Sequence, residues 1–244
     1  MLLASVRNWG LCLASVLLLQ LLLPAWGKAE DTDGLYLRTY FAFNQLQNST
    51  FYLQGDRIAW NPTGGIDPFD FDEAEKSGPT NVGHFKISGD TMEVTWGGDR
   101  GKQTWRIERQ DGKMSALDGG LVSKVGAYKQ DQTLNATFGG ALTAGGANGI
   151  TASRSITFTD NGKFTLSTAA TAEQNPNVIG ANGAVSNSSG GSYTLSGNTL
   201  TLTFDDGKTE KHTVFPYSTT TDSANAKLDD EKLFFDTQML SRER

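Results

Sequence analysis

The sequence has little of what a disulfide-stabilised or zinc-binding protein needs. Its only cysteine is Cys12, and its only histidines are His84 and His212. Neither histidine has a second His or Cys at the spacing of a zinc site. The chain after Cys12 has no disulfide to rely on, so a hydrophobic core must stabilise it.

Motifs for catalysis and cofactor binding are lacking as well. No Gly-x-Ser-x-Gly elbow occurs, and the glycines between Gly139 and Gly149 do not have the spacing of a dinucleotide fingerprint. Gly207-Lys208-Thr209 resembles the end of a phosphate loop, but Leu202 stands where that loop needs a glycine. A hydrolase would require a polar cluster inside the fold that no motif reveals. We therefore expect a protein without enzymatic activity and without a cofactor.

Acidic residues outnumber basic residues in the sequence. The chain has 21 Lys and Arg against 27 Asp and Glu. Loss of residues 1–29 would remove Arg7 and Lys28 and no acid, leaving 19 basic residues and a net charge of −8. Nucleic acids and anionic membrane surfaces are bound by basic patches, so this balance argues against both as partners.

The first 29 residues are typical of a secretory signal peptide. Arg7 supplies a positive charge, an apolar stretch runs from Leu11 to Leu23, and small residues follow. Cleavage is expected near Gly27 or Ala29, which predicts a secreted or periplasmic protein. The apolar stretch is shorter than the roughly 20 residues of a spanning helix, so no transmembrane segment is expected in the mature chain.

The most informative feature present is a repeat. Residues Gly83 to Trp96 and Gly191 to Phe204 align as two copies of one pattern. Each copy alternates apolar and polar residues about a Gly-Asp or Gly-Asn pair, which is typical of a two-residue β-hairpin with one buried face. The sequence therefore predicts an internal duplication.

A two-residue loop fixes which residues of each copy face one another. The expected apolar pairs are Phe85 with Val94 and Ile87 with Met92 in the first copy, and Tyr193 with Leu202 and Leu195 with Leu200 in the second. All non-conservative differences between the copies fall on the opposite face. The shared face behaves as a scaffold, while the outward pairs have diverged.

Short apolar runs separated by turn residues continue along the rest of the chain. They predict an all-β protein of two related antiparallel meander units, either small barrels or one shared sandwich. Hairpins are expected at Gly55-Asp56 and at Asp160-Asn161-Gly162. The strand candidates are Leu35 to Phe43, Phe51 to Leu53, Ile58 to Trp60, Phe85 to Ile87, Met92 to Trp96, Trp105 to Ile107, Met114 to Leu117, Leu134 to Phe138, Ile156 to Phe158, Phe164 to Leu166, Tyr193 to Leu195, Leu200 to Phe204, Thr213 to Phe215 and Leu233 to Phe235.

The predicted organisation is a signal peptide (1–29), a first unit (30–122), a connector (123–132) and a second unit (133–244). The whole segment from Gly119 to Gln132 is expected to join the two halves. The stretch from Ala169 to Gly190 is rich in Ala, Asn, Ser and Gly, which favours a mobile loop. The register of the strand after Phe204 stays open, with either Glu210 or Lys211 on the apolar face.

One segment, Asp67 to Pro79, breaks the β pattern and predicts a short helix in the first unit. Asp67 is suited to cap it, Pro68 to begin it, and Gly78-Pro79 to end it. Its acids (Asp67, Asp70, Asp72, Glu73 and Glu75) could bind calcium, but they lack the alternating ligands and central glycine of a calcium-binding loop. Capping and solvation of the helix are the favoured interpretation.

Aromatic residues are more numerous in the first unit, and core packing is their simplest explanation. The alternative is that the first unit encloses an apolar ligand, with the predicted helix as a lid, since small antiparallel barrels can hold one small ligand. The candidate ligand-binding residues are Tyr36, Trp60, Phe85, Trp96 and Trp105. An outer-membrane barrel competes with both, but its strands need about 9–11 residues and most runs here are shorter.

The second copy, with its neighbours, carries a resemblance. Its pattern, Gly-x-Tyr-x-Leu-x-Gly-Asn-Thr-Leu-Thr-Leu-x-Phe-Asp-Asp-Gly-Lys, is similar to the lipocalin-like, calycin-type repeats of uncharacterised secreted bacterial proteins. With both copies counted, the resemblance extends over most of Leu35 to Leu240. It implies a bacterial envelope or extracellular setting and a meander β-barrel, and it implies no catalytic residues.

These observations lead to a function hypothesis and one alternative. We expect an exported, non-enzymatic β-barrel protein that binds a small apolar or amphipathic ligand. The alternative is a structural or protein-interaction role, such as an adhesin or inhibitor of the cell envelope, that uses exposed sheet edges and the acidic helix.

Overall fold

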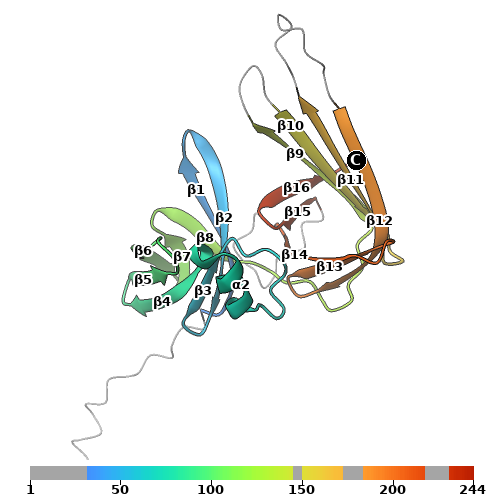
Figure 1. Cartoon of the computed structure of the whole chain (residues 1–244). Helices are drawn as coiled ribbons and strands as arrows, with labels where there is room; N and C mark the ends of the chain where they lie inside the picture. Colours follow the sequence, from blue (N-terminus) through green and yellow to red (C-terminus); the bar gives the residue numbers. More distant parts are fainter. Residues whose placement is uncertain (1–31, 145–149, 173–183, 218–230) are drawn as a thin grey trace, which may run out of the picture. The chain divides into compact units, whose positions relative to one another are not determined.

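The computed structural model of the chain describes residues 32–144, 150–172, 184–217 and 231–244 (Figure 1). The expected signal peptide lies outside these residues. Residues from Thr32 onward form one compact unit, which contains two sheets that each close into a barrel.

The first barrel is an up-and-down meander in which each strand pairs with the next. It closes by antiparallel pairing of the first and last strands. Its strands are β1 (Gly34–Ala42), β2 (Gln45–Gln54), β3 (Arg57–Trp60), β4 (Val82–Ser88), β5 (Thr91–Trp96), β6 (Lys102–Gln110), β7 (Lys113–Leu117) and β8 (Gly120–Lys124).

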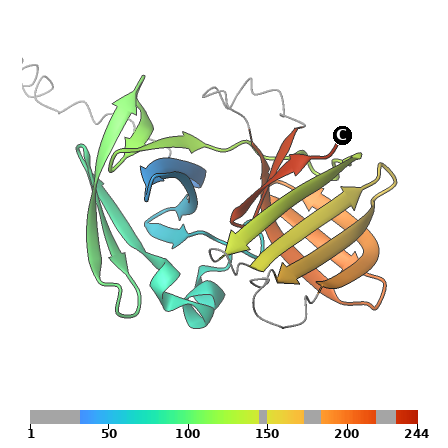
Figure 2. The same ribbon diagram turned by 90° about the horizontal axis from the view of Figure 1, so that it is seen from above.

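The second barrel repeats this topology and closes where β16 pairs with β9. Its strands wrap around a common interior (Figure 2). They are β9 (Ala136–Ala144), β10 (Ile150–Phe158), β11 (Lys163–Ala172), β12 (Ala184–Ser196), β13 (Thr199–Phe204), β14 (Thr209–Pro216), β15 (Lys232–Phe235) and β16 (Gln238–Arg242). The all-β prediction of two related units is confirmed, and the two units close separately.

The hairpin registers expected from the repeat are confirmed in both copies. In β4–β5, Gly83 faces Trp96 and Ile87 faces Met92. In β12–β13, Gly191 faces Phe204 in the equivalent position. The two turns share a conformation, because their glycines Gly89 and Gly197 have φ values of 56° and 58°. A glycine with positive φ at the first central position is what two-residue hairpins favour.

Two other predicted hairpins have the expected partners. Leu53 faces Ile58 across the Gly55-Asp56 turn. Phe158 faces Phe164 across the Asp160-Asn161-Gly162 loop. In both barrels, the turn residues in the sequence thus predict which residues pair across these hairpins.

The closing strand of each barrel was not predicted. Residues 120–124 were expected to belong largely to the connection, but they form β8, which pairs with β1 from Tyr36–Lys124 to Thr39–Leu121. β16 lies beyond the last predicted strand. Both strands are only five residues long. Each closes its barrel by pairing with β1 or β9, which would otherwise have an open edge.

The prediction of a loop from Ala169 to Gly190 is wrong at both ends. β11 continues through Ala172, β12 begins at Ala184, and Ala169 pairs with Ser186 between them. Residues 173–183 lie outside the described part. Small and polar residues pair here because the backbone ladder does not require large side chains.

The predicted helix is present but starts later than expected. α2 spans Phe71–Ser77, with Asp70 as its N-cap, since the Asp70 side chain accepts from the Glu73 N–H. It ends at Gly78, and a 3₁₀ turn, η2 (Pro79–Asn81), follows. The expected cap, Asp67, instead accepts a hydrogen bond from the backbone N–H of Asn198 in the second repeat's turn.

The turn of the second repeat makes further hydrogen bonds, both with the segment around Asp67 and with other parts of the chain. The Thr199 hydroxyl accepts the backbone N–H groups of Ile66 and Asp67, each at 2.9 Å. Asn198 donates its side-chain amide to the carbonyl oxygens of Gly126 and Val214. Asp67 is therefore used in a tertiary contact, which explains why it is not the helix cap.

Candidate functional site

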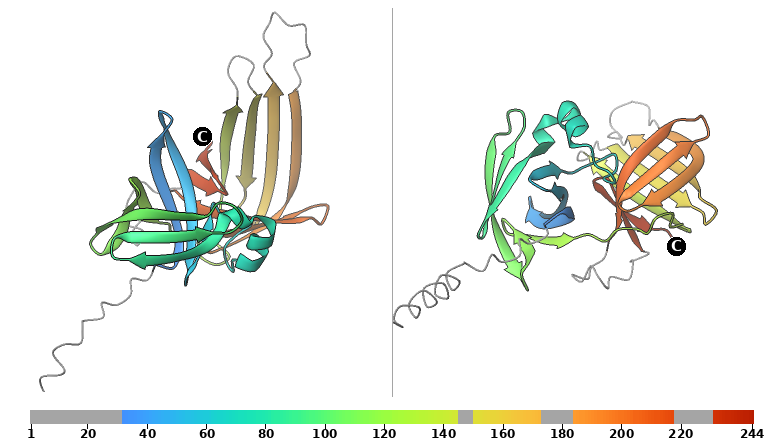
Figure 3. Two further views of the ribbon diagram at one scale, coloured as in Figure 1. Left: turned by 60° about the vertical axis from the view of Figure 1, so that its left-hand side comes forward. Right: turned by 90° about the horizontal axis from the view of Figure 1, so that it is seen from below.

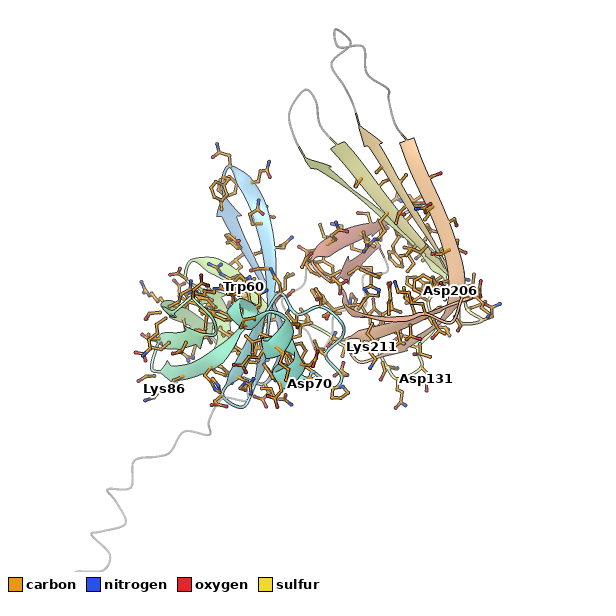
Figure 4. All side chains as sticks on the ribbon, in the orientation of Figure 1. Trp60, Asp70, Lys86, Asp131, Asp206 and Lys211 are labelled. Carbon is orange, nitrogen blue, oxygen red and sulfur yellow. The ribbon has the colours of Figure 1, made fainter. Side chains whose placement is uncertain are left out.

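Three of the predicted ligand-binding residues come together in the first barrel. The rings of Trp60, Trp96 and Trp105 pack pairwise, with centroids 6.3, 5.7 and 5.9 Å apart. Figure 4 labels Trp60 among the strands of this barrel. Tyr36 stacks on Phe51 at 5.2 Å. All of these rings belong to or pack against one hydrophobic core.

The fifth predicted residue, Phe85, also packs against this core and is partly exposed. An arginine covers the tryptophan cluster. The Arg100 guanidinium lies 3.9 Å from the centroid of the Trp96 ring, and burial lowers the pKa of Arg100. The Trp96 indole N–H donates to Gln103 at 2.9 Å. The rings thus pack against one another and against Arg100 and Gln103, as in a filled core.

The helix does not act as a lid over this interior. Phe71 packs in a separate cluster with Ala59 and Val82. Ala59 lies between Ile58 and Trp60, whose side chains belong to the barrel core, so Ala59 faces the other side of the strand. The lid prediction is wrong, because α2 covers the outer wall of β3 and β4.

The acids of α2 are engaged by an arginine. Arg57 forms ion pairs with Asp72 at 3.3 Å and Glu75 at 3.1 Å, and its guanidinium lies 5.0 Å from the Phe71 ring centroid. Within the described ranges, no three His, Cys, Asp or Glu side chains are grouped as they would be to hold a metal ion. These contacts give the acids a structural role.

A cavity of about 340 Å³ is lined by residues of β9 to β12 and by Gln238 of β16, all in the second barrel. Most of its lining residues are small, and one carries a charge. They are Gly140, Ala152, Ser153, Arg154, Thr168, Ala169, Ala170, Asn187 and Gln238. None of these residues was among the candidate ligand-binding residues predicted from the sequence.

Arg154 is placed in this cavity by the strand register. It lies two residues before Ile156, which is fully buried in the barrel core, so both side chains share the inner face of β10. Its partners across the ladder are Gly140 and Thr168. A glycine and a threonine leave room beside the guanidinium that larger residues would fill.

The surroundings of Arg154 do not neutralise its charge. Its guanidinium lies 5.3 Å from the ring centroid of Phe235, a core residue. No acidic side chain in the described part of the chain forms an ion pair with it. Arg154 is therefore a partly buried cation with an aromatic face on one side and open space on another.

Two acidic residues of the second barrel, Glu210 and Asp236, already have side-chain partners. The register left open in the sequence places Glu210 opposite Leu202 and His212 opposite Leu200, so both face the interior. His212 Nδ1 lies 2.8 Å from Asp236 Oδ2, and its ring centroid is 4.4 Å from that of Phe235.

Glu210 contacts two neighbouring side chains, Lys208 and His212. Its Oε1 accepts a hydrogen bond from Lys208, which lowers the pKa of Glu210. Its Oε2 lies 3.4 Å from His212 Nε2, without the geometry of a hydrogen bond. Asp236 and Glu210 thus have contacts other than Arg154, while His212 Nε2 has no hydrogen-bond partner among the described residues.

One signal in the sequence could have revealed Arg154. The hairpin at Asp160-Asn161-Gly162 was predicted with Ile156 facing Leu166, and extending that register by two residues brings Arg154 opposite Thr168. An arginine on the same strand face as buried apolar residues is uncommon, so this pattern indicates a position with a special role.

No protein-family model matches the chain, and neither a curated protein nor a solved structure does. Among the described residues, the helices fall short of the length and apolar character of a membrane-spanning segment.

Proposed function

We propose that the second barrel binds a small amphipathic molecule through an anionic head group, with a straight-chain carboxylate as the simplest example. The observation that carries the proposal is Arg154, which has no acidic partner among the described residues and lies at a cavity of about 340 Å³. A guanidinium presents a planar fork that matches a carboxylate, and such charge-assisted pairs are stronger than neutral hydrogen bonds.

The other lining groups suit the remainder of such a ligand. Gly140, Ala152 and Ala170 offer a narrow wall without polar side chains, along which an alkyl chain can lie. Thr168 and Asn187 add hydrogen-bonding groups beside the arginine, because they follow it across the ladder. The volume lies near the lower end of the range for small-molecule sites, which favours a compact or short-chain ligand.

The proposal is one of binding without catalysis, in an exported barrel of the lipocalin-like kind. The up-and-down meander of eight strands supports this class, since barrels of this size can enclose one small ligand. His212 Nδ1 is paired with Asp236, and its Nε2 lies 3.4 Å from a carboxylate oxygen of Glu210. Export rests on the sequence of the first 29 residues.

Calorimetric titration with three ligands of equal chain length tests the proposal. Decanoate is expected to bind, decan-1-ol to bind about tenfold more weakly or worse, and decylamine not to bind, because only the carboxylate pairs with Arg154. Equal affinity for decanoate and decan-1-ol would show that Arg154 does not pair with the carboxylate. Absence of binding by all three would contradict the proposal.

A further inference from the structure

A separate feature of the first barrel is the exposed apolar tip of its first hairpin. The β1–β2 hairpin reaches beyond the neighbouring strands of its barrel (Figures 1 and 3). At its end, Phe41 is 71%, Phe43 is 96% and Leu46 is 66% exposed. Phe41 and Leu46 face each other across the ladder, and Phe43 lies in the turn between them. Large apolar side chains gathered in this way mark an interaction site.

The backbone of the turn holds Phe43 outward. Phe43 and Asn44 have φ values of 51° and 59°, the conformation of a two-residue hairpin turn that favours Asn and Gly. A bulky residue with positive φ is a genuine outlier. Since the ring is 96% exposed, packing within the fold does not account for a phenylalanine at this position. Such an outlier supports a role outside the fold.

The hairpin also differs in charge from the rest of the chain. From Gly34 to Gly55 the sequence contains no Asp, Glu or Lys, although the whole chain carries a net charge of −6. Its one charged residue, Arg38, lies five positions before Phe43 and donates to the carbonyl oxygens of Leu117 and Asp118. The guanidinium also stacks 4.4 Å from the Tyr40 ring centroid. The tip itself is therefore uncharged.

The size of the tip favours a lipid surface over a protein partner. Two phenylalanines and a leucine bury on the order of 400–500 Å², whereas each partner of a standard protein interface contributes about 800 Å². An apolar element that enters a bilayer surface needs to reach only about 5–10 Å, and two strand residues span about 7 Å.

We propose that the tip formed by Phe41, Phe43 and Leu46 inserts into the head-group region of an uncharged or zwitterionic lipid surface. Phenylalanine and leucine are found on apolar faces that enter a membrane to this depth, and the tip carries no charge that would have to be dehydrated. The acidic remainder of the protein would be repelled by an anionic surface, so zwitterionic lipid is the matching occupant. This inference is independent of the Arg154 cavity.

Flotation of the protein with phosphatidylcholine vesicles tests the inference. The wild-type protein is expected to float with the vesicles, and Phe43→Ser is expected to lower the vesicle partition coefficient about tenfold or more, as Phe41→Ser should. Leu121→Ser is the matched control. Leu121 is also 71% exposed, but it lies opposite Thr39, further from the turn. This variant should float like the wild type.

Three outcomes would overturn the inference. One is a wild-type protein that stays with the unbound fraction, and another is a Phe43→Ser variant that floats as well as the wild type. The third is self-association that depends on Phe43 without vesicle binding, seen by analytical ultracentrifugation, which would assign the tip to a contact between copies of the chain. Decanoate titration of Phe43→Ser should match the wild type, so loss of vesicle binding and loss of ligand binding are distinguishable.

Discussion

Arg154→Leu is expected to weaken decanoate binding about tenfold to a hundredfold, because it removes the cation that pairs with the carboxylate. Hydrogen bonds to charged groups contribute about 1.5–3 kcal/mol when the partner is lost. The change should abolish the preference for decanoate over decan-1-ol, since the alkyl contacts with Gly140 and Ala152 remain. Isothermal titration of the variant with both ligands measures the effect.

Two further arginine variants complete this test. Arg154→Lys keeps the charge but loses the planar fork and its stacking on Phe235, so an intermediate affinity is expected. Arg106→Leu removes one positive charge from the exposed surface of the first barrel and should leave decanoate affinity unchanged. An Arg154→Leu variant that binds decanoate like the wild type would disprove the assigned role.

Gly191→Ala and Gly83→Ala are each expected to destabilise the fold by about 1–3 kcal/mol, with the larger effect at Gly191. A Cβ at Gly191 would collide with the carbonyl oxygen of Thr203 and lie 2.8 Å from the Phe204 Cα. At Gly83 the equivalent Cβ would collide with the Thr95 carbonyl oxygen. Backbone atoms of a paired strand cannot move aside as a flexible side chain can.

Equilibrium unfolding in urea measures these losses, and a third glycine supplies the control. A Cβ at Gly126 would have Pro216 Cγ as its nearest neighbour, at 4.0 Å, so Gly126→Ala should change the free energy of unfolding little. Equal stability of all three variants would mean that Gly83 and Gly191 are not required by close strand contact. The two copies of the repeat would then share a residue for another reason.

The repeat made the central part of each barrel predictable. Alternation about Gly89-Asp90 and Gly197-Asn198 fixed the register of two hairpins, and the same logic placed Leu53 opposite Ile58. These elements satisfy local rules that do not depend on the remainder of the chain, namely turn chemistry and period-two burial.

The closing strands were beyond such local rules. In β8 only Gly120 and Val122 are buried, and in β16 only Leu240 is buried. One or two buried side chains in five residues do not distinguish a strand from a connection. They form strands because they pair with the free edge of β1 or β9, and this pairing joins segments far apart in the sequence.

The candidate site was predicted in the other barrel. Reasoning from aromatic residues selected Trp60, Trp96 and Trp105, which the structure brings together in a packed cluster. The cavity instead lies among Ala, Gly, Ser and Thr, because small side chains leave space where large ones fill it. Arg154 lies in a stretch with weak alternation of apolar and polar residues, and its inward position follows only from the register of β10 with β11, four residues before Phe158.

The central claim is that ligand binds at Arg154 in the second barrel, and NMR titration with decanoate tests it most directly. The account predicts shifts of the Arg154 side-chain Nε–H and of the amides of Gly140, Thr168 and Asn187. The indole N–H signals of Trp60, Trp96 and Trp105 should stay in place. Shifts of those indole signals with an unchanged Arg154 would place the ligand in the first barrel and contradict the account.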